Sequence, residues 1–194
     1  MRIGLDVDGV MYKFFSVYNK HLMELGHEVD LDGHPEEWDY FDKYGYSVEE
    51  FKGHLDELVD SKKLFWTGDL YDSGIPWFIQ RFRELGHTVH IVTNRYSGKQ
   101  ECSQEATKHY FKEEGIEYDS LTFTADKTSV PVDIFLEDHP GNYDALDAAG
   151  VEVWLVDRPY NMSPEGDDRR RVRTFGEFAE KIFHRSFEEQ AYLS

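Results

Sequence analysis

The most informative stretch of the sequence is Ile3-Gly4-Leu5-Asp6-Val7-Asp8-Gly9-Val10, almost at the start of the chain. Its apolar beginning predicts a buried strand that ends in two carboxylates one residue apart. Because side chains alternate along an extended chain, Asp6 and Asp8 point the same way, and Gly9 lets the backbone turn sharply beyond them. Two carboxylates held together repel, so they need a cation, a shared proton or a reacting group. The alternative is an acidic strand end that only caps the next helix.

The composition is that of a folded, acidic protein. A chain of 194 residues with 40% hydrophobic and 15% aromatic residues can form one sizeable core. The net charge of −18 argues against a long nucleic acid as partner, since such partners need basic surfaces. Cys102 is the single cysteine, which excludes an intramolecular disulfide and a cysteine metal cluster. We expect no membrane association and a cytoplasmic location, because no apolar run is long enough to span a bilayer and no signal peptide precedes the first strand.

Five short apolar runs predict buried strands, and the segments between the later ones predict helices. The strands are expected at residues 3–6, 89–93, 121–123, 134–136 and 153–156. The helices are expected at residues 75–85, 101–114 and 142–149, with a last one at about 174–183. Strands and helices that alternate at this spacing imply parallel pairing and right-handed crossovers. The sequence therefore predicts a three-layer α/β fold, a Rossmann-like core around a parallel sheet.

The interval between the first two strands is too long for one crossover helix. Residues 15–25 and 48–64 show helical apolar spacing, on either side of an irregular aromatic piece. We interpret residues 14–69 as a small helical cap inserted after the first strand, and residues 1–13 and 70–194 as the core. The aromatic rings near the cap are suited to stack on a nucleobase, or they form the cap's own apolar core. The three expected at the substrate are Phe14, Trp38 and Phe65.

Polar side chains follow four of the predicted strands, at the point where each ends. They are Asp6 and Asp8, then Thr93 and Asn94, then Lys127, and finally Glu137 and Asp138. Open parallel sheets bind ligands beyond the carboxyl ends of their strands. Carboxylates, a hydroxyl and a lysine that converge there are suited to phosphoryl transfer with a hard divalent cation. The alternatives are a surface role for the lysine and helix capping for the hydroxyl and amide.

These motifs, in this order, resemble the haloacid dehalogenase superfamily of phosphohydrolases. Within it the chain is most similar to the 5′(3′)-deoxyribonucleotidases and their phage and bacterial relatives. The similarity covers roughly residues 1–14 and 65–160, and residues 126–130 and 133–138 look most like that branch. Two positions depart from the pattern: Lys13, where the branch often has an acidic residue, and Glu137, where it usually has Asp.

The resemblance implies a role for each polar residue. Asp6 would attack phosphorus and form an aspartyl-phosphate, and Asp8 would protonate the leaving alcohol and then activate water. Thr93 and Lys127 would bind phosphoryl oxygens, with Asn94 beside them at the substrate. The cofactor would be Mg²⁺, with Asp6, Asp8 (through its backbone carbonyl) and Asp138 as ligands and Glu137 orienting the metal's waters.

The sequence thus predicts a Mg²⁺-dependent phosphatase whose partner is a small phosphate monoester. The expected substrate is a nucleotide, in a 5′-nucleotidase that acts on deoxyribonucleoside monophosphates. A phosphatase of sugar phosphates, a phosphatase of nucleic-acid ends and a non-catalytic nucleotide-binding protein are the alternatives. The oligomeric state stays open, a homodimer included. The basic run Arg169–Arg171 is expected to be a solvated loop.

Overall fold

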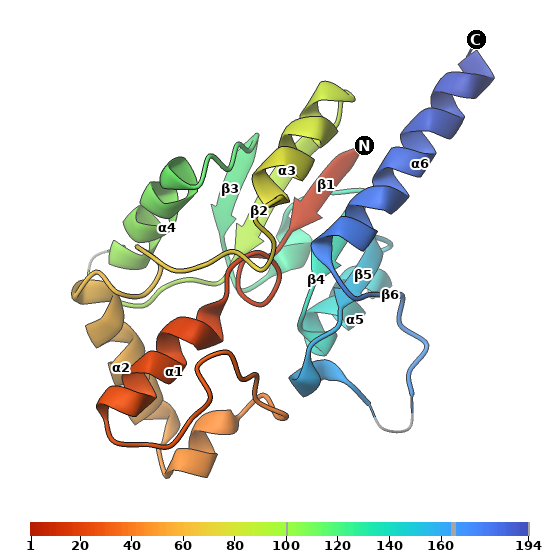
Figure 1. Cartoon of the computed structure of the whole chain (residues 1–194). Helices are drawn as coiled ribbons and strands as arrows, with labels where there is room; N and C mark the ends of the chain where they lie inside the picture. Colours follow the sequence, from red (N-terminus) through yellow and green to blue (C-terminus); the bar gives the residue numbers. More distant parts are fainter. Residues whose placement is uncertain (100, 164–165, 194) are drawn as a thin grey trace.

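A six-stranded parallel sheet forms the centre of the computed structural model, which describes residues 1–99, 101–163 and 166–193 (Figure 1). The strands are β1 (Arg2–Leu5), β2 (Thr88–Thr93), β3 (Ser120–Phe123), β4 (Ile134–Glu137), β5 (Glu152–Val156) and β6 (Arg171–Val172). Their order across the sheet is β3-β2-β1-β4-β5-β6, and each neighbouring pair is parallel. The chain runs outward in both directions from β1 and β4. The gap between these two strands is therefore the switch point at which such sheets bind ligands.

Helices complete the layers on the two faces of the sheet. They are α3 (Ile75–Glu84), α4 (Cys102–Glu113), α5 (Pro140–Ala148) and α6 (Phe175–Leu193). Helices α3 and α6 pack against each other, whereas α5 packs against β4 and β5. Helix α6 continues about one half of its length beyond the predicted end, because the later residues keep helical spacing. No helix among the described residues is long and apolar enough to cross a bilayer.

Each face of the sheet has its own apolar cluster, because neighbouring residues of a strand point to opposite faces. In β4, Leu136 belongs to the cluster that includes Phe82 and Phe178, from α3 and α6. The adjacent Phe135 belongs to the cluster that includes Leu146 of α5. Gly4 of β1 lies against Phe135, and a Cβ atom there would come within 2.3 Å of its ring. The prediction of a three-layer α/β fold with a parallel sheet is confirmed.

The long interval after β1 holds three helical segments beside the carboxyl ends of the strands (Figure 1). They are α1 (Phe14–Glu24), the 3-10 helix η1 (Tyr40–Tyr44) and α2 (Val48–Asp60). Helix α2 begins with a capping box, in which Ser47 Oγ accepts from Glu50 N and the Glu50 carboxylate accepts from Ser47 N. The apolar cluster of the sheet continues into these helices. The division into a cap and a core remains an interpretation of the sequence.

Tyr12 links the chain that leaves β1 to the chain that returns toward the sheet after α2. Its hydroxyl donates to Thr67 O at 2.7 Å and accepts from Phe65 N at 3.2 Å. Gly68 has a φ of 132°, and a Cβ atom on it would lie 2.7 Å from the Tyr12 ring. The outgoing and returning chains therefore lie side by side, and position 68 requires glycine.

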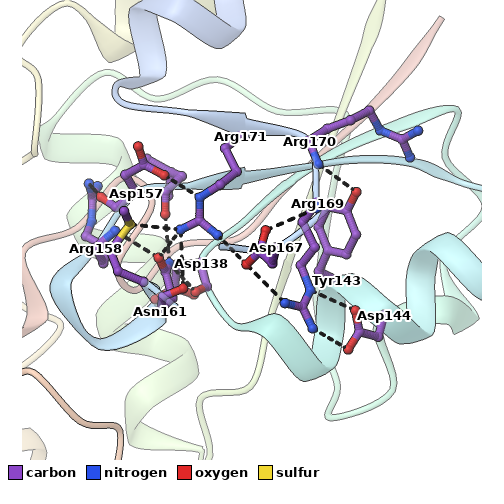
Figure 2. Close-up of polar contacts among 12 residues, drawn as sticks. Asp138, Tyr143, Asp144, Asp157, Arg158, Asn161, Asp167, Arg169, Arg170 and Arg171 are labelled. Carbon is purple, nitrogen blue, oxygen red and sulfur yellow. Dashed lines mark hydrogen bonds and ion pairs between the residues drawn. The ribbon is translucent and has the colours of Figure 1, made fainter. Parts of the chain in front are cut away.

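Arg169 and Arg170 lie in the loop before β6, as predicted, and Arg170 is exposed, whereas Arg171 belongs to the strand, which corrects the prediction at that position. All three arginines pair with carboxylates, and Figure 2 shows the pairs of Arg169 with Asp144 and of Arg171 with Asp157. Arg169 and Arg170 pair with Asp144 and Asp147 on α5. A strand of two residues carries too little apolar pattern to be recognised in the sequence.

Candidate active site

The polar strand ends meet in one cavity of about 280 Å³ at the switch point. All ten side chains that the sequence singled out line it. They are Asp6, Asp8, Phe14, Trp38, Phe65, Thr93, Asn94, Lys127, Glu137 and Asp138. A larger hollow of about 920 Å³ lies among residues 19–44 and contains none of the predicted catalytic groups. The predicted catalytic residues therefore all lie at the smaller cavity.

A buried lysine between two carboxylates forms the floor of this cavity. Lys127 Nζ lies 2.7 Å from Asp6 Oδ2 and 2.7 Å from Glu137 Oε2. Lys127 begins the short 3-10 helix η2 (Lys127–Ser129), whose first turn is capped by Asp126. Burial favours the neutral amine, but the two carboxylates outweigh it and raise the pKa of Lys127 above its usual value. The lysine is therefore a fixed positive charge directly beside the proposed nucleophile, and not a surface residue.

The carboxyl groups of the cavity are crowded enough to perturb one another. Burial raises the pKa of Asp6 to about 7, with Lys127 opposing the rise and Glu137 adding to it. Burial, then repulsion from Glu137 and Asp6, raises the pKa of Asp138 well above its usual range. Burial and the neighbouring carboxylates disfavour the charged forms of Asp6 and Asp138, and a bound cation would offset this repulsion.

The donor set fits a hard divalent cation. Ligand oxygens of Asp6, Glu137 and Asp138, all buried, lie within 4.8 Å of one another. Carboxylate oxygens are the ligands that Mg²⁺ prefers. Glu137 also accepts from Asn142 Nδ2 at 3.0 Å and from His139 N at 3.2 Å, which fixes its orientation.

Gly9 allows the first and fourth strand ends to approach each other. Its φ is 74°, and a Cβ atom there would lie 1.9 Å from Asp138 Oδ2 and 2.5 Å from the Tyr160 hydroxyl. Both the conformation and the space exclude a side chain. Gly9 therefore allows the turn that the sequence predicts and also the close approach of Asp138 and Tyr160 to the main chain after Asp8.

Asp8 has a partner that the sequence analysis did not identify. Arg95 Nε and Nη2 donate to its two carboxylate oxygens at 2.8 and 2.7 Å. The arginine side chain is fully buried, with its guanidinium over the rings of Phe65 and Tyr12. Its position directly after Thr93-Asn94 marks Arg95 as a residue of the strand end, but it does not show that the side chain reaches Asp8.

The end of β5 also contributes to the site. Tyr160 lines the cavity, and its hydroxyl donates to Asp138 Oδ2 at 2.5 Å. Asn161 Nδ2 donates to Asp138 O at 2.7 Å. The rule that strand ends carry functional residues was applied to four strands, and its extension to the fifth would have found both.

Aromatic side chains line the same cavity as the carboxylates. Phe14 lies parallel to Tyr18 at a centroid distance of 6.0 Å and also lines the cavity. The same ring therefore packs against its own helix and is open to a ligand in the cavity. Phe65 is buried beneath Arg95, while Trp38 is 50% exposed and contacts His139. A role in substrate binding remains a prediction for all three predicted aromatics.

Comparison with known proteins places the fold. No family model matches the chain. YfnB of Bacillus subtilis, a protein provisionally described as a HAD (haloacid dehalogenase) hydrolase and solved bound to magnesium, superposes with a TM-score of 0.56 and 11% identity over 93% of this chain and 97% of that one. A Thermotoga maritima protein provisionally described as β-phosphoglucomutase gives a TM-score of 0.58 and 14% identity over 96% and 98%. The chain therefore has the haloacid dehalogenase fold, which confirms the resemblance seen in its sequence.

One curated relative is more specific. A Chlorobaculum tepidum protein provisionally named 5′(3′)-deoxyribonucleotidase is 24% identical over 152 residues, which are 77% of this chain and 75% of that protein. Together with the hydrolase neighbours, this relative supports a phosphatase.

Proposed function

We propose that the protein is a Mg²⁺-dependent phosphomonoesterase that acts on nucleoside monophosphates, with 5′-deoxyribonucleotides as the preferred class. The observation that carries the proposal is the buried contact of Lys127 with Asp6 and Glu137 at the switch point. A binding protein needs a cation for phosphate, but it has no need of a carboxylate held beside that cation in the position of a nucleophile.

Phosphate binding follows from the charges around the cavity. A phosphate monoester is an anion and is repelled by the carboxylates, so it must be held by positive charge and by hydrogen-bond donors. Lys127 supplies the charge, and Thr93 and Asn94 supply a hydroxyl and an amide at the end of β2. These groups orient the phosphorus toward Asp6.

The proposed reaction has two displacements on phosphorus. In the first, an Asp6 carboxylate oxygen forms a bond to phosphorus while the bond to the alcohol oxygen breaks, and Asp8 gives that oxygen a proton. In the second, Asp8 takes a proton from water as the water oxygen attacks the aspartyl-phosphate, which releases phosphate and restores Asp6. The two hydrogen bonds from Arg95 hold the Asp8 carboxylate in place as the base of this second step.

Asp6, Glu137 and Asp138 would hold the cation in this proposal, with the backbone carbonyl of Asp8 beside them. Mg²⁺ supplies positive charge that offsets the negative charge of the phosphate and the acidic cluster. Tyr160 and Asn142, through Asp138 and Glu137, keep two of these carboxylates oriented.

The choice of substrate rests on the wall of aromatic rings and on the Chlorobaculum relative. Rings suit a nucleobase, since each base offers a π-face for stacking. Sugar phosphates are the second candidate, because the Thermotoga neighbour is provisionally described as a phosphoglucomutase.

Phosphate release from a panel of esters with Mg²⁺ tests the proposal. The panel contains deoxyribonucleoside and ribonucleoside 5′- and 3′-monophosphates, sugar phosphates and a 5′-phosphorylated oligonucleotide. We expect turnover of the deoxyribonucleotides, and a loss of at least about a thousandfold in Asp6→Asn. Asp133→Asn is the matched control, because Asp133 pairs with Arg2 at the opposite end of the sheet. Turnover of sugar phosphates alone would replace the substrate assignment, and no turnover of any ester would overturn the proposal.

A further inference from the structure

A short turn after β5 is hydrogen-bonded to the main chain on both loops that carry the acidic cluster. This turn consists of Arg158 and the 3-10 helix η3 (Pro159–Asn161). Arg158 Nε donates to Gly9 O at 2.7 Å, so the turn fixes the loop that carries Asp8. Asn161 Nδ2 donates to Asp138 O and to Val156 O, at 2.7 and 2.8 Å. One segment thereby fixes the main chain at two of the strand ends that form the cavity.

The turn is itself held by β6, as Figure 2 shows. Arg171 Nη2 donates to Asn161 Oδ1 at 2.6 Å, and Arg171 Nε donates to Asp157 Oδ1 at 2.7 Å. Arg158 N donates to the same Asn161 oxygen at 3.1 Å. With its main chain and Asn161 fixed in this way, the turn is a rigid base for the side chain of Tyr160.

Tyr160 contacts Asp138 as well as aromatic residues of the segment between β1 and β2. Its hydroxyl donates to Asp138 Oδ2, which leaves Oδ1 for a cation. Its ring contacts Trp38, at a centroid distance of 5.4 Å, and Phe15, at 5.5 Å. Trp38 also lies edge-on to His139, the residue after Asp138, at 4.4 Å. The exposed tryptophan from the helical insertion therefore lies against the Asp138 strand end.

We propose that Tyr160 is a positioning residue that couples cation binding at Asp138 to the placement of Trp38 at the mouth of the cavity. A hydrogen bond to one carboxylate oxygen fixes the rotation of the group and aims the other oxygen. Such outer partners of metal ligands change metal affinity by about 10- to 100-fold when they are removed. Because the tyrosine ring is rigid, a shift of its hydroxyl with Asp138 also moves the ring that Trp38 contacts. The inference rests on the proposed function only for the presence of a cation at the acidic cluster.

Calorimetric titration with Mg²⁺ alone tests the first half of the coupling. Tyr160→Phe keeps the ring and removes the hydroxyl, so we expect Mg²⁺ to bind about tenfold more weakly. Tyr143→Phe is the matched control, because the Tyr143 hydroxyl accepts from Arg170 N and lies on the right of Figure 2, away from Asp138. An affinity in Tyr160→Phe equal to that in Tyr143→Phe would overturn the inference. A merely structural role would lower the melting temperature and leave the affinity unchanged.

Tryptophan fluorescence at saturating Mg²⁺ tests the second half. We expect Mg²⁺ to change the emission of the parent protein, and this change to be absent in Trp38→Phe and in Tyr160→Phe. A change that persists in Tyr160→Phe at saturation would show that Trp38 responds without the hydroxyl, and would overturn the coupling. A parent protein that binds no Mg²⁺ contradicts both this inference and the metal in the proposed function. A parent that binds Mg²⁺ with this coupling but cleaves no ester contradicts the proposed function alone.

Discussion

Arg95 forms a bidentate ion pair with Asp8, which lies 87 positions earlier in the sequence. The arginine side chain is fully buried, and the aspartate lines the cavity. Arg95 is also fixed by Thr107, whose hydroxyl accepts from Nη1 at 3.0 Å. A planar guanidinium matches both oxygens of a carboxylate at once, which lysine does not do. The pair therefore sets the orientation of Asp8 before any substrate arrives.

Arg95→Lys should keep the positive charge and lose the orientation of Asp8. We expect kcat to fall by at least about tenfold, because general acid–base catalysis depends on the placement of the carboxyl group. Arg169→Lys is the matched control, since Arg169 forms the same bidentate ion pair with the exposed Asp144, away from the cavity. Equal kcat values in the two variants, both folded, would show that Arg95 serves packing alone.

Chelation of divalent cations should abolish phosphate release, and Mg²⁺ should restore it. Ca²⁺ should support little turnover, because its longer and more variable coordination places the phosphoryl group differently. Asp138→Asn should weaken Mg²⁺ binding by at least about tenfold, whereas Asp144→Asn, on the exposed side of α5, should not. Full turnover in excess chelator would exclude a metal from the reaction.

Without divalent cations, the Asp6 carboxyl should contribute less stability as the pH rises from about 4 to about 7, in opposition to surface carboxylates whose pKa values are lowered by ion pairs. Burial raises the pKa of Asp6 to about 7, while that of an unfolded aspartate is about 3.9. Between these values the folded protein holds a proton that the unfolded chain releases, so a higher pH favours unfolding. Stability from this group is complete below the lower value and lost as the pH passes the upper one. The raised pKa of Asp138 acts in the same direction.

Urea unfolding at several pH values in chelator measures this dependence. Between about pH 4 and pH 7, the free energy of unfolding of Asp6→Asn should fall less, or rise more, than that of the parent, because the variant cannot titrate at this position. Mg²⁺ favours the ionised carboxylates, so the rise in melting temperature that it causes should be larger at about pH 8 than at about pH 5. A pH dependence in Asp6→Asn equal to that of the parent would mean that Asp6 does not titrate in this window.

Phe14→Ala should reduce the preference for nucleotides over small esters. A stacked base contributes about 1–3 kcal/mol, so kcat/KM for a deoxyribonucleotide should fall by roughly ten- to a hundredfold while that for a generic ester changes little. Phe187→Ala on α6, where the ring is 58% exposed, is the matched control. An equal loss on both substrates would mean that Phe14 supports the site through its contact with Tyr18.

The sequence predicted the core of the site because strand ends carry local signals. Asp6, Lys127 and Asp138 each follow a short apolar run, and parallel pairing brings such positions together whatever the details of packing. The partners of these residues were not predicted, because they depend on contacts between distant segments. Nothing in the local sequence of Arg95 shows that it reaches back to Asp8.

The limits of the sequence are also visible at β6 and in the helical insertion. A two-residue strand has no period to recognise, so Arg171 was assigned to a loop. The insertion was located by its length and composition, but which faces of Phe14 and Phe65 stay open depends on how its rings pack together.

The junction at Tyr12 has a consequence for how this protein can diversify. Lys13 N donates to Asp69 O at 2.9 Å and Tyr71 N donates to Met11 O at 2.8 Å, so residues 14–69 leave and rejoin the sheet at one point. A segment with such a closed base can lengthen, shorten or be exchanged without altering the order of the strands. Changes within residues 14–69 can therefore alter the aromatic lining of the cavity while the strand ends that carry Asp6, Lys127 and Asp138 keep their places.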